Sequence, residues 1–173
     1  MPATYYSITK SDLFDLFSRL AEKNRVFVPY KYDDKFHFGE FSTDKESAIE
    51  LGGIRQSQPF KSFLNPVREM VSDKEKNDGR PCTSRKTVVF APVQGKPVIV
   101  AGVKACDLSS LVLQDYVFLK GDSEDPFYAF HRGNTLIISC DCTYAKETCF
   151  CIAMSGAPYP TKYFDLNLSS QDG

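Results

Sequence analysis

Four cysteines near the end of the sequence lie close enough together to form one chemical site. The chain has six cysteines, and four of them fall within twelve residues, at Cys140, Cys142, Cys149 and Cys151. Thiols grouped in this way form disulfides in oxidising compartments, bind zinc, or hold an iron–sulfur cluster. The rest of the sequence has to decide between these three kinds of site.

The compartment that we expect for this protein disfavours disulfides. Residues 1–17 contain no basic segment followed by a long apolar run, so no signal peptide is expected. The longest apolar stretches, such as residues 97–103, are too short to span a bilayer. We therefore expect a cytoplasmic protein. In the reducing cytosol such cysteines bind metal or act in catalysis more often than they pair.

The composition is that of an ordinary globular protein. The 173 residues favour a single domain over 1–173, and 42% of them are hydrophobic and 25% charged. The 21 Lys and Arg residues nearly balance the 22 Asp and Glu residues, which gives a formal net charge of −1. Nucleic-acid binding needs a basic stripe that displaces counterions from phosphates, so this balance argues against a nucleic-acid partner.

The N-terminal part of the sequence predicts a helix and two strands. Apolar residues recur every three or four positions from Ser11 to Lys23, as on one face of an amphipathic helix. Thr9 and Asp12 form a capping pair at its start. Residues 25–41 then read as two short strands around a polar turn at Asp33–Asp34.

The next segment is less regular. It predicts a helix entered through Pro66 and then a polar loop that contains Cys82, which we interpret as an incidental thiol. A strand at 86–93 follows, joined by a Gln94–Gly95 turn to a second strand at 96–103, as in a hairpin.

A crossover unit follows in the second half of the chain. The strand at 96–103 leads into a helical pattern at 108–119, and residues 134–140 are again an apolar strand. Such units are right-handed and place their two strands parallel in one sheet. The sequence therefore predicts an α/β fold, with a mixed sheet, a parallel strand pair and packed helices.

This crossover brings together cysteines from distant parts of the chain. Cys106 lies just beyond the carboxyl end of the first strand, and Cys140 lies at the carboxyl end of the second. In a parallel pair both ends open on the same sheet edge, where α/β proteins bind ligands. Cys106 and Asp107 also begin the helix, whose exposed N–H groups favour thiolates. The loop after Cys140 returns Cys149 and Cys151 to this edge, so four thiolates can converge there.

The cysteine spacing favours an iron–sulfur cluster over a zinc ion but does not exclude either. The cysteines of 140–151 could hold zinc alone, but ligands of structural zinc sites are typically separated by two to four residues. Here one residue separates the members of each pair, in CDC and CFC. An iron–sulfur cube is larger and takes thiolates from irregular, distant positions. The bacterial ferredoxin spacing is absent.

The sequence resembles the N-terminal half of the beta subunits of sulfhydrogenases, and a component of anaerobic sulfite reductase is similar. That family has a G-x-x-x-C-D strand end, a central S-C and a late C-F-C in this order, as this chain does at Gly102–Asp107, Ser139–Cys140 and Cys149–Cys151. Weaker likenesses cover further parts of the chain, at 27–38, 59–66 and 163–168.

The resemblance implies which residues bind a cofactor. The family pattern places the ligands of one 4Fe–4S cluster at Cys106, Cys140, Cys149 and Cys151. Cys142 has no counterpart in the pattern and is interpreted as a spare thiol. Asp107 matches the pattern beside Cys106, and we interpret it as a helix-capping residue rather than a ligand.

The resemblance also implies a role and partners. It suggests a non-catalytic electron-transfer subunit that works between the catalytic subunit of an anaerobic oxidoreductase complex and a flavin or ferredoxin-type subunit. That complex would be a hydrogenase or resemble heterodisulfide reductase or sulfite reductase. Family members usually continue into a domain with two ferredoxin-type 4Fe–4S motifs, whereas this sequence ends at Gly173. We therefore expect one of two arrangements. Either the protein is a hetero-oligomer in which another subunit supplies those clusters, or the chain is a shortened form.

Two other functions stay open at this point. One is a zinc-stabilised protein-interaction module built on the C-x-C pairs, without a redox role. The other is thiol catalysis by Cys106 with Asp107 and His131, which requires a histidine near the thiolate. His37, by contrast, is interpreted as an ordinary strand residue.

Overall fold

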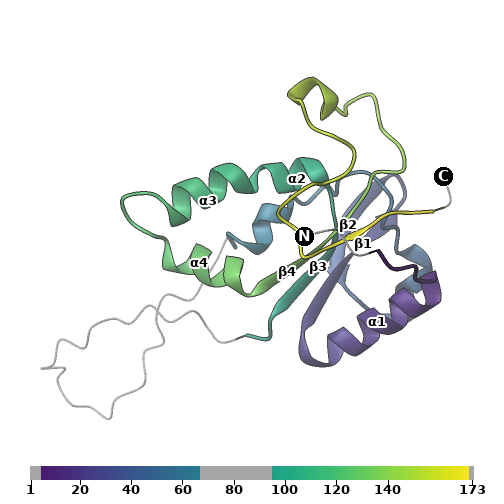
Figure 1. The fold of residues 1–173 in the computed structure, drawn as a ribbon. Coiled ribbons are helices and arrows are strands. Elements are labelled where there is room, and N and C mark those ends of the chain that lie inside the picture. The colour runs from purple at the N-terminus through teal and green to yellow at the C-terminus, as the bar shows by residue number, and fades with distance from the viewer. Residues whose placement is uncertain (1–4, 67–94, 172–173) are drawn as a thin grey trace, which may run out of the picture.

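One five-stranded sheet forms the centre of the computed structural model, which describes residues 5–66 and 95–171. The strand order is β2-β1-β3-β4-β5, and helices pack on the sheet (Figure 1). The sheet contains antiparallel and parallel pairs, so the predicted α/β class with a mixed sheet is confirmed. The helix expected after Pro66, the loop with Cys82 and the strand at 86–93 lie outside the described residues.

The first two strands form an antiparallel hairpin. β1 (Arg25–Tyr32) pairs with β2 (Lys35–Glu40), and Asp33 in the turn has a φ of 51°. Aspartate tolerates this left-handed region better than most residues, which suits it to the turn. The predicted strand pair is therefore confirmed. His37 is exposed in β2, opposite Tyr30 of β1.

The remaining strands are parallel. β3 (Val98–Val103) lies between β1 and β4 (Thr135–Cys140) and runs parallel to both, and β5 (Leu166–Leu168) continues the sheet parallel to β4. The predicted parallel pair is confirmed. The sequence did not predict that β1 pairs with β3. It did not predict β5 either, because three residues are too few to show the alternation of a strand.

The longest helix covers one face of the sheet. α1 (Lys10–Lys23) packs its Phe14 and Phe17 into a core that includes Val28 of β1 and Ile99 of β3. Thr9 Oγ1 accepts a hydrogen bond from the Asp12 backbone N–H at 3.1 Å, so the predicted cap is present. The helix begins one residue before the predicted Ser11.

Several shorter helices cover the other face. They are α2 (Ala105–Ser109), α3 (Leu111–Leu119), α4 (Pro126–Gly133) and the 3₁₀ helix η2 (Phe60–Phe63). Together they bury the second side of β3 and β4 in a separate apolar core. Because successive strand residues point to opposite faces, adjacent residues such as Ile99 and Val100 belong to different cores.

The helical region after β3 differs from the prediction in two ways. The expected helix, with Cys106 and Asp107 at its start, begins at Ala105 but is divided at Ser110 into α2 and α3. α4 was not predicted from the sequence, where its first residues follow the acidic residues Asp122, Glu124 and Asp125. Its start is nevertheless marked in the sequence, because the Asp125 side chain caps the helix and Pro126 occupies its first turn.

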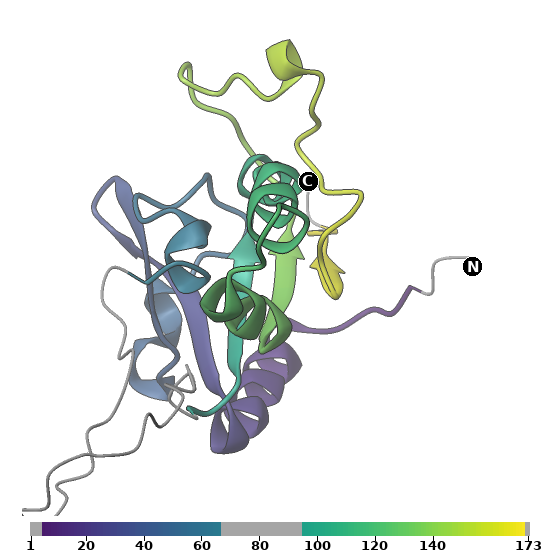
Figure 2. The ribbon, with the colours of Figure 1, turned by 90° about the vertical axis from the view of Figure 1, so that its left-hand side faces the viewer.

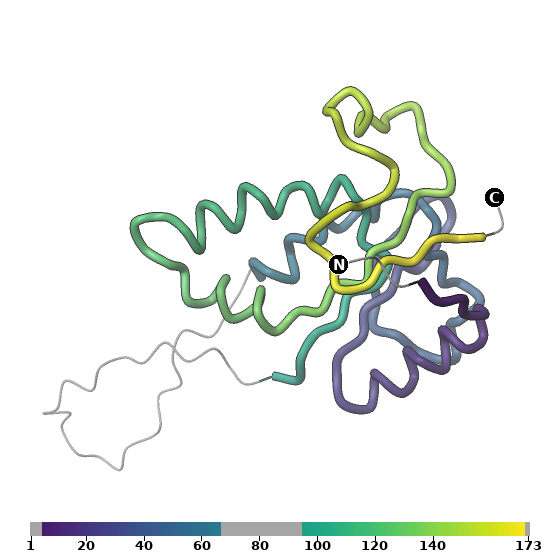
Figure 3. Tube along the Cα trace, viewed as in Figure 1, coloured from purple at the N-terminus to yellow at the C-terminus, as the bar shows by residue number. Residues whose placement is uncertain are grey.

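A long connection joins β4 to β5 and projects from the sheet. We call its residues 141–158 the cysteine loop. Figures 2 and 3 show it leaving the carboxyl end of β4, and it contains the short 3₁₀ helix η3 (Ile152–Met154). Another 3₁₀ helix, η1 (Thr43–Ala48), follows β2. In the described part of the chain, no helix has the length and apolar character needed to cross a membrane.

Candidate functional site

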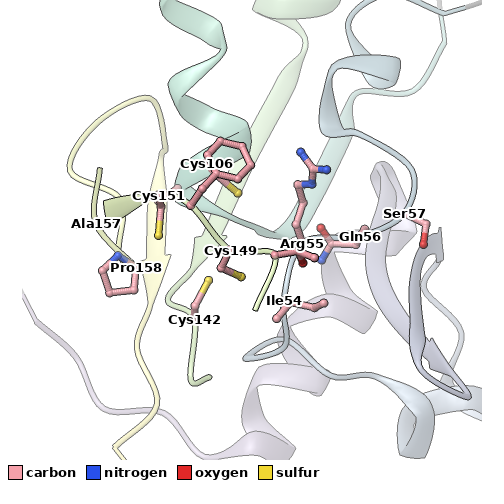
Figure 4. Close-up of a pocket in the computed structure, with 13 residues that line it drawn as sticks. Ile54, Arg55, Gln56, Ser57, Cys106, Cys142, Cys149, Cys151, Ala157 and Pro158 are labelled. Carbon is pink, nitrogen blue, oxygen red and sulfur yellow. The ribbon is translucent and has the colours of Figure 1, made fainter. Parts of the chain in front are cut away.

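A pocket opens near the carboxyl ends of the parallel strands. Three segments line it: residues 54–57, the start of α2 at 105–106, and the cysteine loop (Figure 4). Its volume is about 260 Å³. One water molecule requires only roughly 10–15 Å³, so the pocket has room for a group of several atoms.

Four thiols line this pocket, which we call the thiol pocket. They belong to Cys106, Cys142, Cys149 and Cys151, and Figure 4 shows them around one space. These four cysteines and Cys140 are free thiols. Among the residues that the structure describes, no three Cys, His, Asp or Glu side chains form a group that could hold a metal ion.

The thiol pocket contains three of the four cysteines that were predicted as ligands. Cys106, Cys149 and Cys151 line it. Cys140 does not, and it is only 5% exposed at the end of β4. Cys142, interpreted from the sequence as a spare thiol, takes the fourth position in the pocket wall.

The end of β3 and the turn into α2 position Cys106. Gly102 has a φ of +79°, and the register between β3 and β4 shifts at this point. A Cβ atom at Gly102 would also come within 2.8 Å of Pro29 Cγ, so both the backbone angle and the close contact require glycine. The chain then enters α2, and Asp107 lies in its first turn rather than at the cap, which is Lys104.

Backbone hydrogen bonds fix the base of the cysteine loop. The Cys142 N–H donates to the Pro158 carbonyl at 2.9 Å, which joins the two ends of the loop. The Thr143 N–H and hydroxyl both donate to the Gly52 carbonyl, at 3.0 and 2.9 Å. The loop is therefore tied to the segment that provides residues 54–57 of the pocket wall.

Local hydrogen bonds also shape the tip of the loop around the other two thiols. The Lys146 N–H donates to Cys149 Sγ at 3.3 Å, and the Gly156 N–H donates to the Cys151 carbonyl at 2.7 Å. The backbone of the loop therefore fixes the position of the Cys149 sulfur.

A buried lysine joins the segments below the pocket. Lys104 has no exposed surface, and its ammonium donates to the carbonyls of Leu51 at 2.6 Å, Asp141 at 3.1 Å and Cys140 at 3.4 Å. Burial lowers the pKa of Lys104, and the nearby thiols of Cys140 and Cys142 oppose this effect. The lysine therefore lies within electrostatic reach of the site's sulfur atoms.

The pKa values of the thiols nearest the sheet are raised. Burial, followed by the Asp107 carboxylate, raises the pKa of Cys106 to about 11, although part of the residue reaches solvent. Burial also raises the pKa values of Cys140 and Cys142, against the opposing charge of Lys104. A metal group bound by these sulfurs would have to displace their protons.

Two buried polar atoms near the site have no hydrogen-bond partner among the described residues. Gln56 is 2% exposed in the pocket wall; its Nε2 donates to the Gly102 carbonyl at 3.2 Å, while its Oε1 has no partner. Asp107 Oδ2 also has none. Burial raises the pKa of Asp107 to about 6, while the positive charges of Arg55 and Lys61 act to lower it.

The histidine considered for thiol catalysis lies elsewhere. His131 belongs to α4, shortly before β4 begins, and Cys140 ends that strand. His131 is therefore near the opposite sheet edge and is not among the residues that line the thiol pocket. The described structure does not assemble the thiol–histidine pair that this chemistry requires.

The chain is similar to a sulfhydrogenase beta subunit. It is 28% identical over 154 residues to sulfhydrogenase 2 subunit beta of Pyrococcus furiosus, which covers 89% of this chain and 42% of that protein. The chain thus spans less than half the length of this relative. No family model and no solved structure matches significantly.

The similarity to the sulfhydrogenase protein confirms the resemblance inferred from the motifs. Several residues in or next to the pocket were nevertheless not identified from the sequence. Arg55 and Gln56 of the pocket wall follow a loop without any recognisable motif. Lys104 lies next to the pocket and occupies an unspecified position of the G-x-x-x-C-D stretch. Cys142 could have been found, because it lies only two residues from a predicted ligand.

Proposed function

We propose that this chain is an electron-transfer subunit that carries one 4Fe–4S cluster. It would relay electrons between the catalytic subunit of an anaerobic oxidoreductase complex and a flavin or ferredoxin-type subunit. The main support is that four thiols from distant segments line one pocket near the carboxyl ends of the parallel strands. The similarity to a sulfhydrogenase beta subunit supports a place in an oxidoreductase complex.

The thiol pocket suits such a cluster in its chemistry and its size. Four thiolates are the usual ligand set of a 4Fe–4S cluster, and the pocket volume of about 260 Å³ leaves room for a group of several atoms. When bound, the cluster supplies one-electron chemistry. Apolar side chains of Ile54, Phe150, Ala157 and Pro158 line the pocket and would limit the access of water.

We assign three ligand positions to Cys106, Cys149 and Cys151 and the fourth to one member of the pair Cys140 and Cys142. The geometry favours Cys142, because it lines the pocket and is partly exposed. Cys140 is buried at the end of β4, and its carbonyl is held by Lys104.

We further propose protein subunits bearing flavin or iron–sulfur clusters as the partners. Phe150, Ile152 and Met154 are 63%, 79% and 72% exposed on the cysteine loop. Exposed apolar side chains that lie together on a surface typically mark protein interfaces. A partner that covers the loop would approach the cluster and shield it from water. The test is co-purification with such a partner from the native source.

The alternative is a zinc-stabilised interaction module. It is favoured by the fact that Cys142, Cys149 and Cys151 all belong to one loop, as ligands of small structural zinc sites commonly do. In this case Cys106 would be a bystander. The two functions therefore differ in the metal that is bound and in the role of Cys106.

Anaerobic purification with iron and zinc analysis tests the proposal. The native protein should be brown and contain about four irons per chain. Substituting serine for a ligand should remove most of the iron, because serine oxygen is a poorer ligand than thiolate for these clusters. We expect this loss for Cys106, Cys142, Cys149 and Cys151.

Cys140→Ser is the matched control, since it makes the same substitution two residues from Cys142. It should leave the iron content and the visible spectrum nearly unchanged, as should Cys82→Ser. If Cys140→Ser loses iron and Cys142→Ser retains it, the fourth ligand is Cys140. If the protein holds zinc and Cys106→Ser has no effect on the metal, the cluster proposal is wrong.

A further inference from the structure

The hydrogen bonds of Lys104 suit a charged ammonium group. Lysine is almost never fully buried without a partner, yet Lys104 has no exposed surface. Its nitrogen donates three hydrogen bonds, to the carbonyls of Leu51, Cys140 and Asp141. An ammonium group has three N–H donors, whereas a neutral amine has two. Three carbonyl acceptors therefore match the charged form.

This buried charge has no carboxylate partner. Within the described part of the chain, no Asp or Glu oxygen lies within ion-pair distance of the Lys104 nitrogen, and the ion pairs found there involve Arg25, Lys31 and Arg132. Burying a charge is unfavourable unless an opposite charge accompanies it. The group of opposite charge on this side of the chain is Asp141, and the thiols of Cys140, Cys142 and Cys106 would join it once a metal group had displaced their protons.

The hydrogen bonds of Lys104 also hold the pocket together. Its own backbone caps α2, which carries Cys106, and its ammonium binds the segment at Leu51 and the start of the cysteine loop at Asp141. These three segments line the thiol pocket. A residue in this position can orient ligands from separate parts of the chain and place a fixed positive charge beside them.

We propose that Lys104 is a positioning residue that supplies the counter-charge of the iron–sulfur cluster and raises its reduction potential. This inference rests on the proposed function. Reduction adds one electron and makes the cluster with its thiolates one unit more negative, with no bond broken. A fixed cation stabilises the more negative form more strongly, so removing the cation makes reduction harder.

The test compares Lys104→Gln, Lys104→Arg and Lys146→Gln in anaerobically purified protein. Lys104→Gln keeps donor groups and removes the charge, whereas Lys104→Arg keeps the charge. Lys146→Gln removes a side-chain charge from the exposed part of the cysteine loop, where water screens it, and keeps the backbone N–H that donates to Cys149 Sγ. The readouts are iron per chain, unfolding temperature, and the midpoint potential from a dithionite titration followed by the visible and electron paramagnetic resonance spectra.

We expect Lys104→Gln to make the midpoint potential more negative by about 59 mV, which is a tenfold change in a one-electron equilibrium. Lys104→Arg and Lys146→Gln should change it much less. Lys104→Gln could instead fold normally but fail to hold iron. If Lys104→Arg then retains its iron, the proposal is supported equally.

Three results would overturn it. An unchanged midpoint potential in Lys104→Gln excludes the electrostatic role of Lys104 but does not contradict the proposed cluster. Loss of folding, or loss of iron, in both Lys104 variants means that the lysine has a purely structural role. Wild-type protein without iron defeats the proposed function and this inference with it.

Discussion

The positions of the cysteines show how far residue type and spacing can predict the site. Cys106, Cys149 and Cys151 were identified from the motifs and line the thiol pocket. The choice between Cys140 and Cys142 depends on side-chain direction, which spacing does not give. Strand alternation puts Cys140 on the same face as the buried Ile138, so its side chain joins the interior.

The glycine that shapes the strand end before Cys106 provides a prediction at this scale. Gly102→Ala should destabilise the protein by about 1–3 kcal/mol, because alanine at a positive φ is strained and its Cβ would press against Pro29. Chemical denaturation measures this change. Gly133→Ala is the control, since nothing lies within 4 Å of a Cβ there. It should be neutral or stabilising in α4, and equal effects of the two changes would contradict this account.

The elements were predicted best where a pattern was long. α1, the β1–β2 hairpin, and the strands β3 and β4 all have a clear apolar period in the sequence. α4 was missed because its first residues follow an acidic run, although Asp125 and Pro126 mark its start. The division of the predicted helix at Ser110 and the pairing of β1 with β3 depend on tertiary packing, which no local pattern records.

α3 and α4 are held together by a partly buried polar contact that can be tested. The Tyr128 hydroxyl donates to Asp115 Oδ1 at 2.6 Å, and Arg132 Nε donates to the same oxygen at 3.3 Å. Tyr128→Phe should lower the free energy of unfolding by about 1–2 kcal/mol, because a hydrogen bond to a carboxylate is lost. Tyr116→Phe is the control, since Tyr116 is 65% exposed on α3. It should have almost no effect.

The same contact predicts a pH dependence. Burial, followed by the hydrogen bond to Asp115, raises the pKa of Tyr128 above its ordinary value. The unfolded tyrosine, with a pKa near ~10, therefore ionises first. The stability that Tyr128 contributes is present below this pH and is lost as the pH rises above it. Tyr128→Phe should lose less stability than the wild type between neutral and strongly alkaline pH. Parallel pH profiles would contradict this assignment.

At the scale of the whole molecule, the site is an assembly of segments that are distant in the sequence. Residues 54–57, the start of α2 and the cysteine loop meet because parallel strands end on the same edge of the sheet. The topology of this edge followed from the crossover pattern. The position of residues 54–57 could not be predicted in this way, because it depends on contacts such as those of Thr143 with Gly52.

A group that binds these segments together should stabilise the entire fold. A ligand that binds only the folded state at about 100 times its dissociation constant adds ~2.7 kcal/mol. In a protein of this size that corresponds to a rise of roughly 5–10 °C in unfolding temperature. Removing iron anaerobically with a chelator should therefore lower the unfolding temperature of the wild type by this amount. The unfolding temperature of Cys106→Ser should already be at this lower value before chelation and should not change further when chelator is added. If chelation leaves the wild type unchanged, no metal joins α2 to the cysteine loop.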